Sequence, residues 1–361
     1  MRTADFEYHL PCDLIAQAPA PQRDESRLLA LRRADGGLAH RQFRDLLDYL
    51  EVGDVLVLND SRVMPARLRG RKTNNGGEIE LLLLEESGVN DWWVMLRPGK
   101  RVHPGTKIVF TNRDSVPISP NTIEAVALAK NSAGHCRLRF SGTPDIAELL
   151  DLLGEVPLPP YIARDEPWKS ADDRERYQTV FAREYGSVAA PTAGLHFTKQ
   201  LLNTIRERGV QVCFVTLHVG LGTFAPVKVE NVEHHVMHEE RFHLDADAAD
   251  TINQAKSLKR RVIAVGTTTL RVLESVAADN AGRMVPTHGR TRIFIYPPCP
   301  FRITDGLLTN FHLPRSTLLM LACAFAAPGE LRGRELVLAA YAEAVRQRYR
   351  FYSYGDAMLI F

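Results

Sequence analysis

Residues 191–226, PTAGLHFTKQLLNTIRERGVQVCFVTLHVGLGTFAP, decide the fold class because two glycine-containing loops bracket a helix and a strand. Thr198 stands at an N-cap position, apolar residues then recur at helical spacing, and Gly209 follows where a helix would end. The apolar, β-branched run 210–217 predicts a buried strand. A helix that leads into such a strand indicates an α/β fold with an open sheet.

The two loops, PTAGLHF and HVGLGTF, form the first candidate ligand site. If residues 187–190 end a parallel neighbouring strand, both loops leave the sheet at the carboxyl ends of its strands, where open α/β sheets bind ligands. Each loop supplies glycine for close backbone approach, one histidine and one phenylalanine. We expect such a set to hold a flat, polar, charged small molecule.

A third turn of the same kind lies in VIAVGTTTLRVLES, where Gly266, Thr267 and Thr268 stand between a strand and a helix. Free N–H groups and the helix dipole make this turn a seat for an anionic group. The motifs GxGxxG and GxxxxGK[ST] are both absent, which argues against a standard dinucleotide fold and against a P-loop.

Composition excludes several classes of protein. A length of 361 residues suggests about two domains, and a net charge of +2 gives no overall signal for nucleic acid. The five scattered cysteines fit a reducing cytosol and argue against a zinc ribbon or a disulfide framework. The first residues lack the pattern of a signal peptide, and the longest apolar run, 318–327, is too short to span a bilayer. We expect a cytoplasmic monomer.

The sequence pattern changes between residues 65 and 140. Short strand-like runs alternate there with turns such as NNGG, SGVND and NSAG, which indicates a small barrel or sandwich. The alternation of expected helices and strands resumes after an expected helix at 145–153 and the link VPLPPYI. We therefore predict a discontinuous α/β domain, 1–63 and 150–361, with an inserted small β-barrel domain, 64–149.

The remaining elements follow from periodicity and turn residues. VLVLND reads as a strand that closes on Asn59 and Asp60, short polar residues that are either site candidates or turn formers. TRIFIYP and LLTNFHLP read as strands, 316–325 and 334–349 as helices, and YRFYSYGDAMLIF as a closing pair of strands.

The segment EHHVMHEERFHLD holds four histidines and raises the alternative of a metal-dependent hydrolase with ligands among His234–His243. The pattern is not HExxH, however, and its alternation indicates a strand. Such a strand directs Glu239 and Arg241 to one face and Glu240 and Phe242 to the other. We therefore favour proton transfer, substrate contacts or hydrogen bonds to buried polar partners for these side chains, and we predict no metal.

Basic residues cluster twice within and beside the expected insertion. They suit either ordinary solvated faces or a surface that follows RNA phosphates, with Trp92 or Trp93 available for base stacking or for the core. A non-catalytic RNA-binding module is therefore a second alternative. The candidate tRNA-binding residues are Arg62, Arg67, Arg69, Arg71, Lys72, Arg97, Lys100 and Arg101.

Several long motifs together resemble the S-adenosylmethionine:tRNA ribosyltransferase-isomerase family of queuosine biosynthesis. They span both ends and most of the middle of the chain. One departure is YPPCPF at 296–301, where the family usually has a glycine-containing turn and where proline stiffens the loop. The motifs are NDSRVMPARL, PTAGLHFT, HVGLGTFAPV, HHVMHEERF, AVGTTTLRVLES, TNFHLPRSTLLML, YRFYSYGDAMLI and an amino-terminal DFEYHLP…RDESRLL.

The resemblance implies transfer of the ribosyl portion of S-adenosylmethionine to 7-aminomethyl-7-deazaguanine at the wobble position of tRNA. The ribose rearranges to an epoxycyclopentane, giving epoxyqueuosine, while adenine and methionine leave. S-adenosylmethionine is consumed as a substrate, so no cofactor and no metal are implied. The family is described as an α/β domain that carries an inserted β-barrel, in agreement with the boundaries above.

That chemistry requires a base for an acidified C5′ proton, an acid for departing adenine and anchors for the methionine group. The candidates for proton transfer are His196, His218, Asp60, Glu240 and Asp356. We expect Phe197 and Phe224 to face the sulfonium or to stack on adenine, and the turn at 266–268 to bind the carboxylate. The expected S-adenosylmethionine-binding residues are Thr192, Gly194, Phe197, Gly220, Gly222, Thr223, Phe224, Gly266, Thr267 and Thr268.

Overall fold

A computed structural model describes residues 1–110, 122–164, 171–220 and 227–361. The chain divides into two compact units. An α/β unit comprises Met1–Arg62, Pro160–Ala163 and Gln178–Phe361, and a barrel unit comprises Val63–Pro159 and Arg164–Tyr177. The barrel unit therefore takes in residues after 149 that the sequence pattern assigns to the α/β domain. A backbone bridge between Glu155 and Arg67 ties this segment to the barrel.

The α/β unit is built on one mixed sheet. Strands β3, β12, β14 and β16 run parallel to one another, whereas β17 and β1 run the opposite way. Two further strands, β4 (Ser61–Val63) and β11 (Glu184–Ser187), form a separate two-stranded sheet. In spatial order the large sheet contains β15 (Thr287–Thr291), β13 (Glu240–Leu244), β12 (Gln211–Leu217), β3 (Val55–Asn59), β14 (Val262–Val265), β16 (Gly306–Asn310), β17 (Ala357–Ile360), β1 (Arg27–Leu31) and β2 (Leu38–Gln42).

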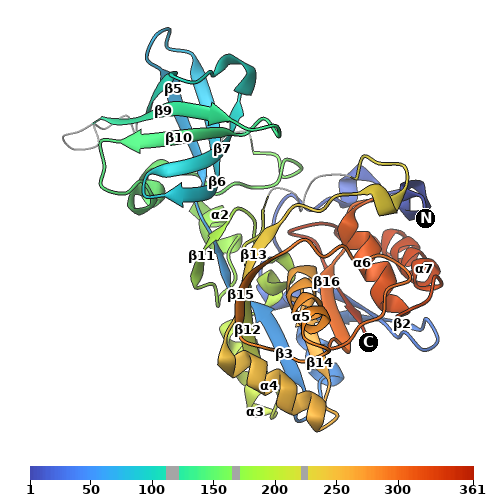
Figure 1. Ribbon diagram of the computed structural model, residues 1–361. Helices are drawn as coiled ribbons and strands as arrows, with labels where there is room; N and C mark the ends of the chain where they lie inside the picture. The colour runs from blue at the N-terminus through green and yellow to red at the C-terminus, as the bar shows by residue number, and fades with distance from the viewer. Residues whose placement is uncertain (111–121, 165–170, 221–226) are drawn as a thin grey trace. The chain divides into compact units, whose positions relative to one another are not determined.

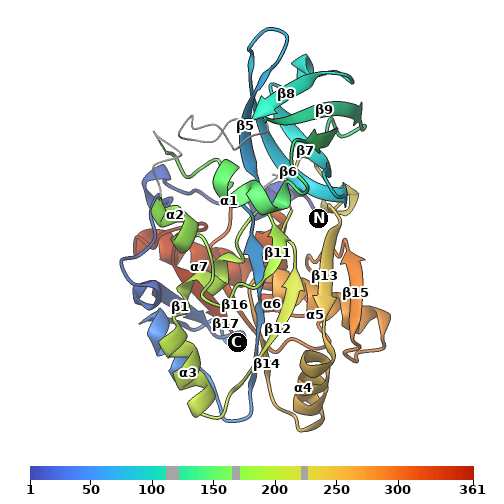
Figure 2. The same ribbon diagram turned by 90° about the vertical axis from the view of Figure 1, so that its left-hand side faces the viewer.

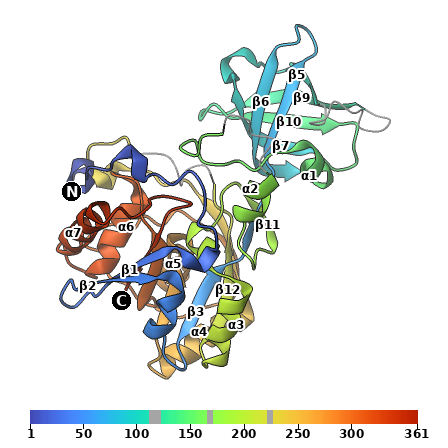
Figure 3. The same cartoon turned by 180° about the vertical axis from the view of Figure 1, so that it is seen from behind.

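Alternation along the strands creates two apolar layers. Val55 and Val57 face a core that includes residues of α4 to α7, whereas Leu56 and Leu58 face a core shared with α3 and the 3-10 helix Phe43–Tyr49. Figure 1 shows the side of α4 to α7, Figure 3 shows the side of α3, and Figure 2 shows α3 and α4 on opposite sides of the strands. The helices are α3 (Lys199–Glu207), α4 (Ala246–Ser257), α5 (Thr267–Asp279), α6 (Thr317–Ala326) and α7 (Gly333–Arg346).

The stretch 191–226 folds as its pattern predicts over its described residues, with one exception. The Thr198 hydroxyl accepts a hydrogen bond from the Leu201 N–H at 3.0 Å, Gly209 has φ of +82°, and α3 and β12 occupy the expected places. The prediction of a parallel neighbour ending at residues 187–190 is wrong. Strands β3 and β13 occupy the two sides of β12, so β11 pairs with β4 instead.

Two other predicted strands are displaced. The strand expected at TRIFIYP lies four residues earlier as β15, because the Thr291 hydroxyl accepts the Ile293 N–H and turns the chain out of the ladder. Only β17 forms from the expected closing pair. Asp356 holds the preceding residues in a turn by accepting the N–H groups of Arg27 and Arg350, and Phe351 makes only an isolated bridge with Ile15.

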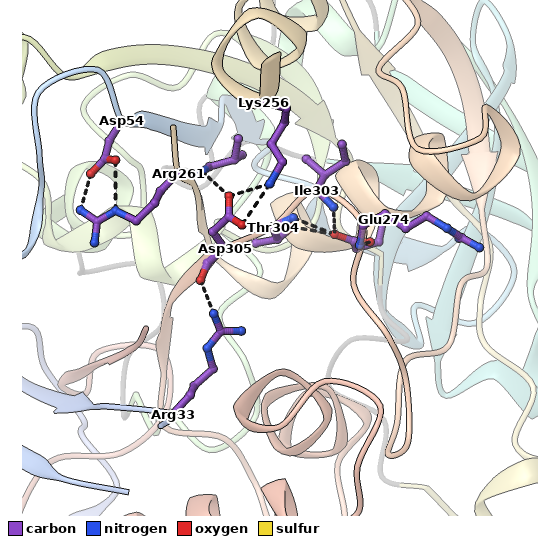
Figure 4. Close-up of polar contacts among 10 residues, drawn as sticks. Arg33, Asp54, Lys256, Arg261, Glu274, Ile303, Thr304 and Asp305 are labelled. Atoms are coloured by element: carbon purple, nitrogen blue, oxygen red, sulfur yellow. Dashed lines mark hydrogen bonds and ion pairs between the residues drawn. The ribbon is translucent and has the colours of Figure 1, made fainter. Parts of the chain in front are cut away.

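Ion pairs and hydrogen bonds connect the amino ends of the parallel strands. Arg261, just before β14, forms an ion pair with Asp54, just before β3. Asp305, just before β16, accepts from Lys256 and from the Val262 N–H, while its carbonyl accepts from Arg33 (Figure 4). Glu274 of α5 accepts three backbone N–H groups at 302–304. These groups satisfy one another, which leaves the opposite edge of the sheet for a site.

The barrel unit is a closed antiparallel barrel (Figure 3). Its β5 alternates arginine on the outside with Leu68 and Gly70 inside, as an amphipathic strand must. Short helical segments at α1 (Leu150–Leu153) and α2 (Ala171–Arg176) belong to this unit. The strands, in order around the barrel, are β10 (Cys136–Ser141), β7 (Asp91–Arg97), β6 (Glu78–Gly88), β5 (Arg67–Lys72), β8 (Lys107–Phe110) and β9 (Ile123–Lys130).

Within the described residues, no helix has both the length and the apolar character needed to cross a lipid bilayer.

Candidate active site

The candidate site lies at the edge of the sheet where the four parallel strands end. Asn59 stands there at the end of β3 and joins three elements. Its amide donates to the Leu217 carbonyl at 3.0 Å and to the Thr268 hydroxyl at 3.3 Å, and its oxygen accepts the N–H groups of Leu217 and Ser61. Because all these groups are buried, Asn59 fixes the ends of β3 and β12 and the start of α5 relative to one another.

The turn from β14 into α5 supplies the amino end of a helix at this edge. Gly266 has φ of +90°, a conformation that favours glycine, and its N–H donates to the Leu308 carbonyl of β16. Thr267 and Thr268 follow as the first buried residues of α5. The first N–H groups of α5 and its dipole therefore lie at the end of a buried strand, in a position that favours an anion.

A small cavity of about 60 Å³ opens at this turn. It brings together the loop at 191–193, the turn at 266–268 and the end of β16, as the sequence predicts for Thr192, Gly266, Thr267 and Thr268. The other lining residues are Tyr161, Ala190, Pro191, Ala193, Val219, Thr309, Asn310, Phe311, His312, Leu313, Ser316, Leu318, Tyr352 and Ser353.

His196 lies behind this cavity as a support for the 3-10 helix Thr192–His196. Its Nδ1 is 2.7 Å from the Ser26 hydroxyl and its Nε2 is 3.3 Å from the Asn310 amide, and its ring stacks on Phe43 at 4.9 Å. Burial, helped by Arg350 and Arg23, lowers the pKa of His196 to about 3. The ring is therefore neutral at pH 7 and engaged on both nitrogens, which suits a positioning role better than proton transfer.

Two predicted ligand contacts lie in the core. The Phe197 side chain is fully buried and packs edge-to-face on Phe43 at 5.0 Å, so it does not face the cavity. Gly194 is buried against Thr179 and Phe181, either of which a β-carbon would crowd. Both residues support the 3-10 helix beside the cavity, and neither lines the cavity.

His218, the residue after β12, differs from His196. Its backbone N–H donates to the Arg241 carbonyl, but its ring Nδ1 is buried without a hydrogen-bond partner in the described part of the chain. Burial lowers the pKa of His218 to about 4, with Arg241 adding to the effect and Asp60 opposing it. Gly186 packs against the ring, since a β-carbon there would come within 2.6 Å of Nδ1.

The three predicted carboxylates reach the same edge, each with partners. Asp60 accepts from the Thr216 hydroxyl at 2.7 Å and from Arg183 at 2.8 Å and 3.1 Å. Asp356 accepts two backbone N–H groups, as described above, and so stabilises the turn before β17. Glu240 of β13 accepts the Gly220 N–H at 3.1 Å and forms a buried ion pair with Arg271 of α5.

Part of the predicted binding loop, Gly222, Thr223 and Phe224, lies outside the described residues. Gly220 is described, and its N–H bond to Glu240 places it beside the cavity wall at Val219. The expected alternation in MHEERFHL is confirmed, because Glu240 and Phe242 are buried while Glu239 and Arg241 are exposed.

Sequence reasoning missed His312, Asn310, Tyr161, Tyr352 and Arg271. His312 lines the cavity, its Nε2 lies 2.8 Å from the Thr309 hydroxyl, and burial lowers its pKa to about 3. Asn310 ends the buried strand β16 and His312 lies two residues beyond it, so the rule that pointed to Asn59 would have found them. Tyr161 and Tyr352, whose rings lie 4.7 Å apart, carry no such signal because they come from distant loops.

The predicted basic residues divide between the two units. Arg62 belongs to the α/β unit, where its guanidinium lies over the Tyr185 ring at 4.4 Å. In the barrel unit, Lys72 is buried and donates to the Arg101 carbonyl, so its charge does not face solvent. Three others on β5 pair with glutamates: Arg67 with Glu80, Arg69 with Glu80 and Glu155, and Arg71 with Glu78. Arg97, Lys100 and Arg101 are exposed around the 3-10 turn Gly99–Arg101.

The histidine-rich segment offers no ligand set for the hydrolase alternative. Across the ranges that the structure describes, no three histidine, cysteine, aspartate or glutamate side chains gather as metal ligands. His243 of β13 instead stacks on His288 of β15, with ring centroids 3.9 Å apart.

Together these features define a two-unit α/β protein with an inserted antiparallel barrel and a polar site at the carboxyl edge of its sheet. Residues 3–360 match the family described as queuosine biosynthesis protein. The chain belongs to this family.

Relatives match over full length. Proteins named S-adenosylmethionine:tRNA ribosyltransferase-isomerase from Carboxydothermus hydrogenoformans and Acetivibrio thermocellus are 50% and 49% identical to the chain, with all of each sequence covered. The crystal structure of S-adenosylmethionine tRNA ribosyltransferase from Thermotoga maritima is 36% identical. It covers 99% of this chain and 100% of its own, with a TM-score of 0.54.

Proposed function

We propose that this protein transfers the ribosyl group of S-adenosylmethionine to 7-aminomethyl-7-deazaguanine in the anticodon of tRNA and isomerises it, giving epoxyqueuosine-tRNA, adenine and methionine. The observation that carries the proposal is full-length identity of about half to relatives that bear this enzyme's name. The site geometry supports it, since a nucleoside with a charged amino-acid tail needs both a cavity and an anion seat.

The cavity at the carboxyl edge of the sheet binds S-adenosylmethionine in this proposal. Thr192, Thr267 and Thr268 supply hydroxyl groups, and the amino end of α5 supplies free backbone N–H groups. Tyr161 and Tyr352 provide aromatic faces where the sequence pattern predicts phenylalanine, which suits stacking on adenine. Gly220 lies at the adjoining end of β12 and admits the ligand close to the backbone.

His218 is our proposed base for the C5′ proton. The positive sulfonium acidifies the adjacent C–H, and a base must hold no proton of its own when the substrate binds. The lowered pKa of His218 keeps its ring neutral at pH 7, and its Nδ1 is unpaired within the described residues. Among the proposed proton carriers, His196, Asp60, Glu240 and Asp356 are each held by the partners given above, which suits them to positioning.

The exposed cations of the barrel unit are the proposed contacts to tRNA. Arg97, Lys100 and Arg101 surround one turn, and Arg69 and Arg71 lie partly exposed on β5. Lysine and arginine in such clusters bind phosphates without reading sequence. Five described cysteines are free, which fits the proposed cytoplasmic location. A monomeric state stays a prediction.

The decisive experiment incubates purified protein with S-adenosylmethionine and tRNA that carries 7-aminomethyl-7-deazaguanine. We expect adenine and methionine to be released in a ratio of one to one with ribosyl incorporation into tRNA. Formation of methylated tRNA with S-adenosylhomocysteine would refute the proposal. Salt-sensitive tRNA binding without any turnover would favour the non-catalytic RNA-binding alternative.

A further inference from the structure

Arg271 of α5 is a buried cation with an unused hydrogen-bonding edge. Only 3% of the residue is exposed, and its Nη1 is paired with Glu240. The Nε and Nη2 groups have no hydrogen-bond partner in the described part of the chain. A buried donor without a partner is costly, and such costs persist in folded proteins chiefly where a ligand or water is bound.

Other arginines of this chain show what that edge binds. Arg137, Arg164 and Arg261 each present Nε and Nη2 together to the two oxygens of one aspartate. This forked geometry matches a planar carboxylate, whereas Nη1 alone does not. The free edge of Arg271 therefore has the donor pattern of a carboxylate receptor.

Two observations place Arg271 close to the cavity. It follows Thr267 by four residues and Thr268 by three, so it lies on the same face of α5 as these lining residues, and helical side chains lean toward the helix amino end. Its partner Glu240 accepts the N–H of Gly220, which directly follows the lining residue Val219. Both observations place the guanidinium beside residues that line the cavity.

We propose that Arg271 binds the methionine carboxylate of S-adenosylmethionine through Nε and Nη2, a step that rests on the function proposed above. Glu240 is then a positioning residue, because it holds Nη1 and turns the free edge toward the ligand. The amino end of α5 lies on the same side and adds its dipole to the attraction. This assignment moves the carboxylate from the backbone of the 266–268 turn to a side chain one helical turn further on.

The test compares two ligands on three full-length proteins and one control variant by calorimetry without tRNA. The ligands are S-adenosylmethionine and decarboxylated S-adenosylmethionine, which lacks only the carboxylate. The proteins are the unmodified chain, Arg271→Gln and Arg271→Lys. Lysine keeps a cation beside Glu240 and so protects folding, but it cannot form the fork. Arg206→Gln, at an exposed position on α3, is the matched control.

We expect the unmodified chain to bind S-adenosylmethionine about 10- to 100-fold more tightly than the decarboxylated ligand, as charged hydrogen bonds allow. Both Arg271 variants should lose that preference while their Kd for the decarboxylated ligand stays unchanged. A preference that survives in Arg271→Lys would overturn the assignment. So would an affinity of Arg271→Gln for S-adenosylmethionine equal to that of the unmodified chain. If the unmodified chain binds neither ligand, the proposed function itself fails.

Discussion

His196, His312 and His218 reach the same edge of the sheet, yet their surroundings give them different uses. Ser26 and Asn310 hold the two ring nitrogens of His196, and Thr309 holds Nε2 of His312. The Nδ1 of His218 has no such partner among the described residues. Residue type alone therefore selected side chains at one edge of the sheet. Hydrogen bonding then separates a histidine held by its neighbours from the proposed proton carrier.

The two buried histidines make stability depend on pH. Burial lowers the pKa of His196 and of His312 to about 3, against about 6.5 in an unfolded chain. Below pH 6.5 these histidines become protonated in the unfolded chain but stay neutral in the folded chain. Their contribution to the free energy of unfolding is therefore fully present above pH 6.5 and decreases as the pH falls toward 3. We expect each histidine to remove about 1.4 kcal/mol per pH unit in that window, measured by urea unfolding at stepped pH. A flat profile between pH 6 and 4 would contradict this.

Replacing His218 tests its proposed role. His218→Asn keeps a polar side chain of similar size but cannot accept a proton, so single-turnover ribosyl transfer should slow by about 10²- to 10⁴-fold. Binding of S-adenosylmethionine should change little, because asparagine keeps the size and polarity of the side chain and the proton transfer follows binding. His288→Asn, on the exposed edge strand β15, serves as the control. An unaltered transfer rate would remove His218 from the mechanism.

At the scale of elements, sequence pattern worked where local signals were redundant. A cap, a helical period, a terminal glycine and a β-branched run all agreed on α3 and β12, and both formed. β15 was misplaced because TRIFIYP alternates like a strand, whereas Thr291 ends the ladder through a side-chain hydrogen bond that periodicity does not encode. Tyr161 and Arg271 escaped notice for a related reason, since their places depend on packing between distant segments.

The barrel's exposed turn gives a prediction about tRNA. Substituting Arg97, Lys100 and Arg101 together by glutamate should weaken tRNA binding and reduce the slope of log K against log salt by about 0.7 to 0.9 for each phosphate that is no longer neutralised. Binding of S-adenosylmethionine should not change, because these residues belong to the other unit. Arg41→Glu, exposed on β2, is the control, and filter binding at several salt concentrations is the measurement. Equal weakening of the affinity for both substrates would contradict separate binding surfaces.

For the molecule as a whole, the two edges of the large sheet carry different kinds of contacts. The amino edge joins Asp54, Arg261, Lys256 and Asp305 in mutual contacts, while the carboxyl edge gathers the cavity and its buried polar groups. Stability and substrate binding should therefore be separable by mutation.

Asp305→Ala tests that separation. The change removes the acceptor for Lys256 and for the Val262 N–H, so we expect the free energy of unfolding to fall by about 1–3 kcal/mol in urea titrations. The Kd for S-adenosylmethionine, measured on the folded variant, should equal that of the unmodified chain. A matching drop in affinity would show that the two edges are coupled.

The position of β17 has a consequence for biosynthesis. This strand, 357–360, is inserted between β16 and β1, and the residues just before it, Tyr352 and Ser353, form part of the cavity. During translation the middle of the sheet stays open until these residues leave the ribosomal exit tunnel. A nascent chain stalled before residue 350 thus has neither a finished scaffold nor a substrate pocket, and it exposes the facing edges of two interior strands to aggregation.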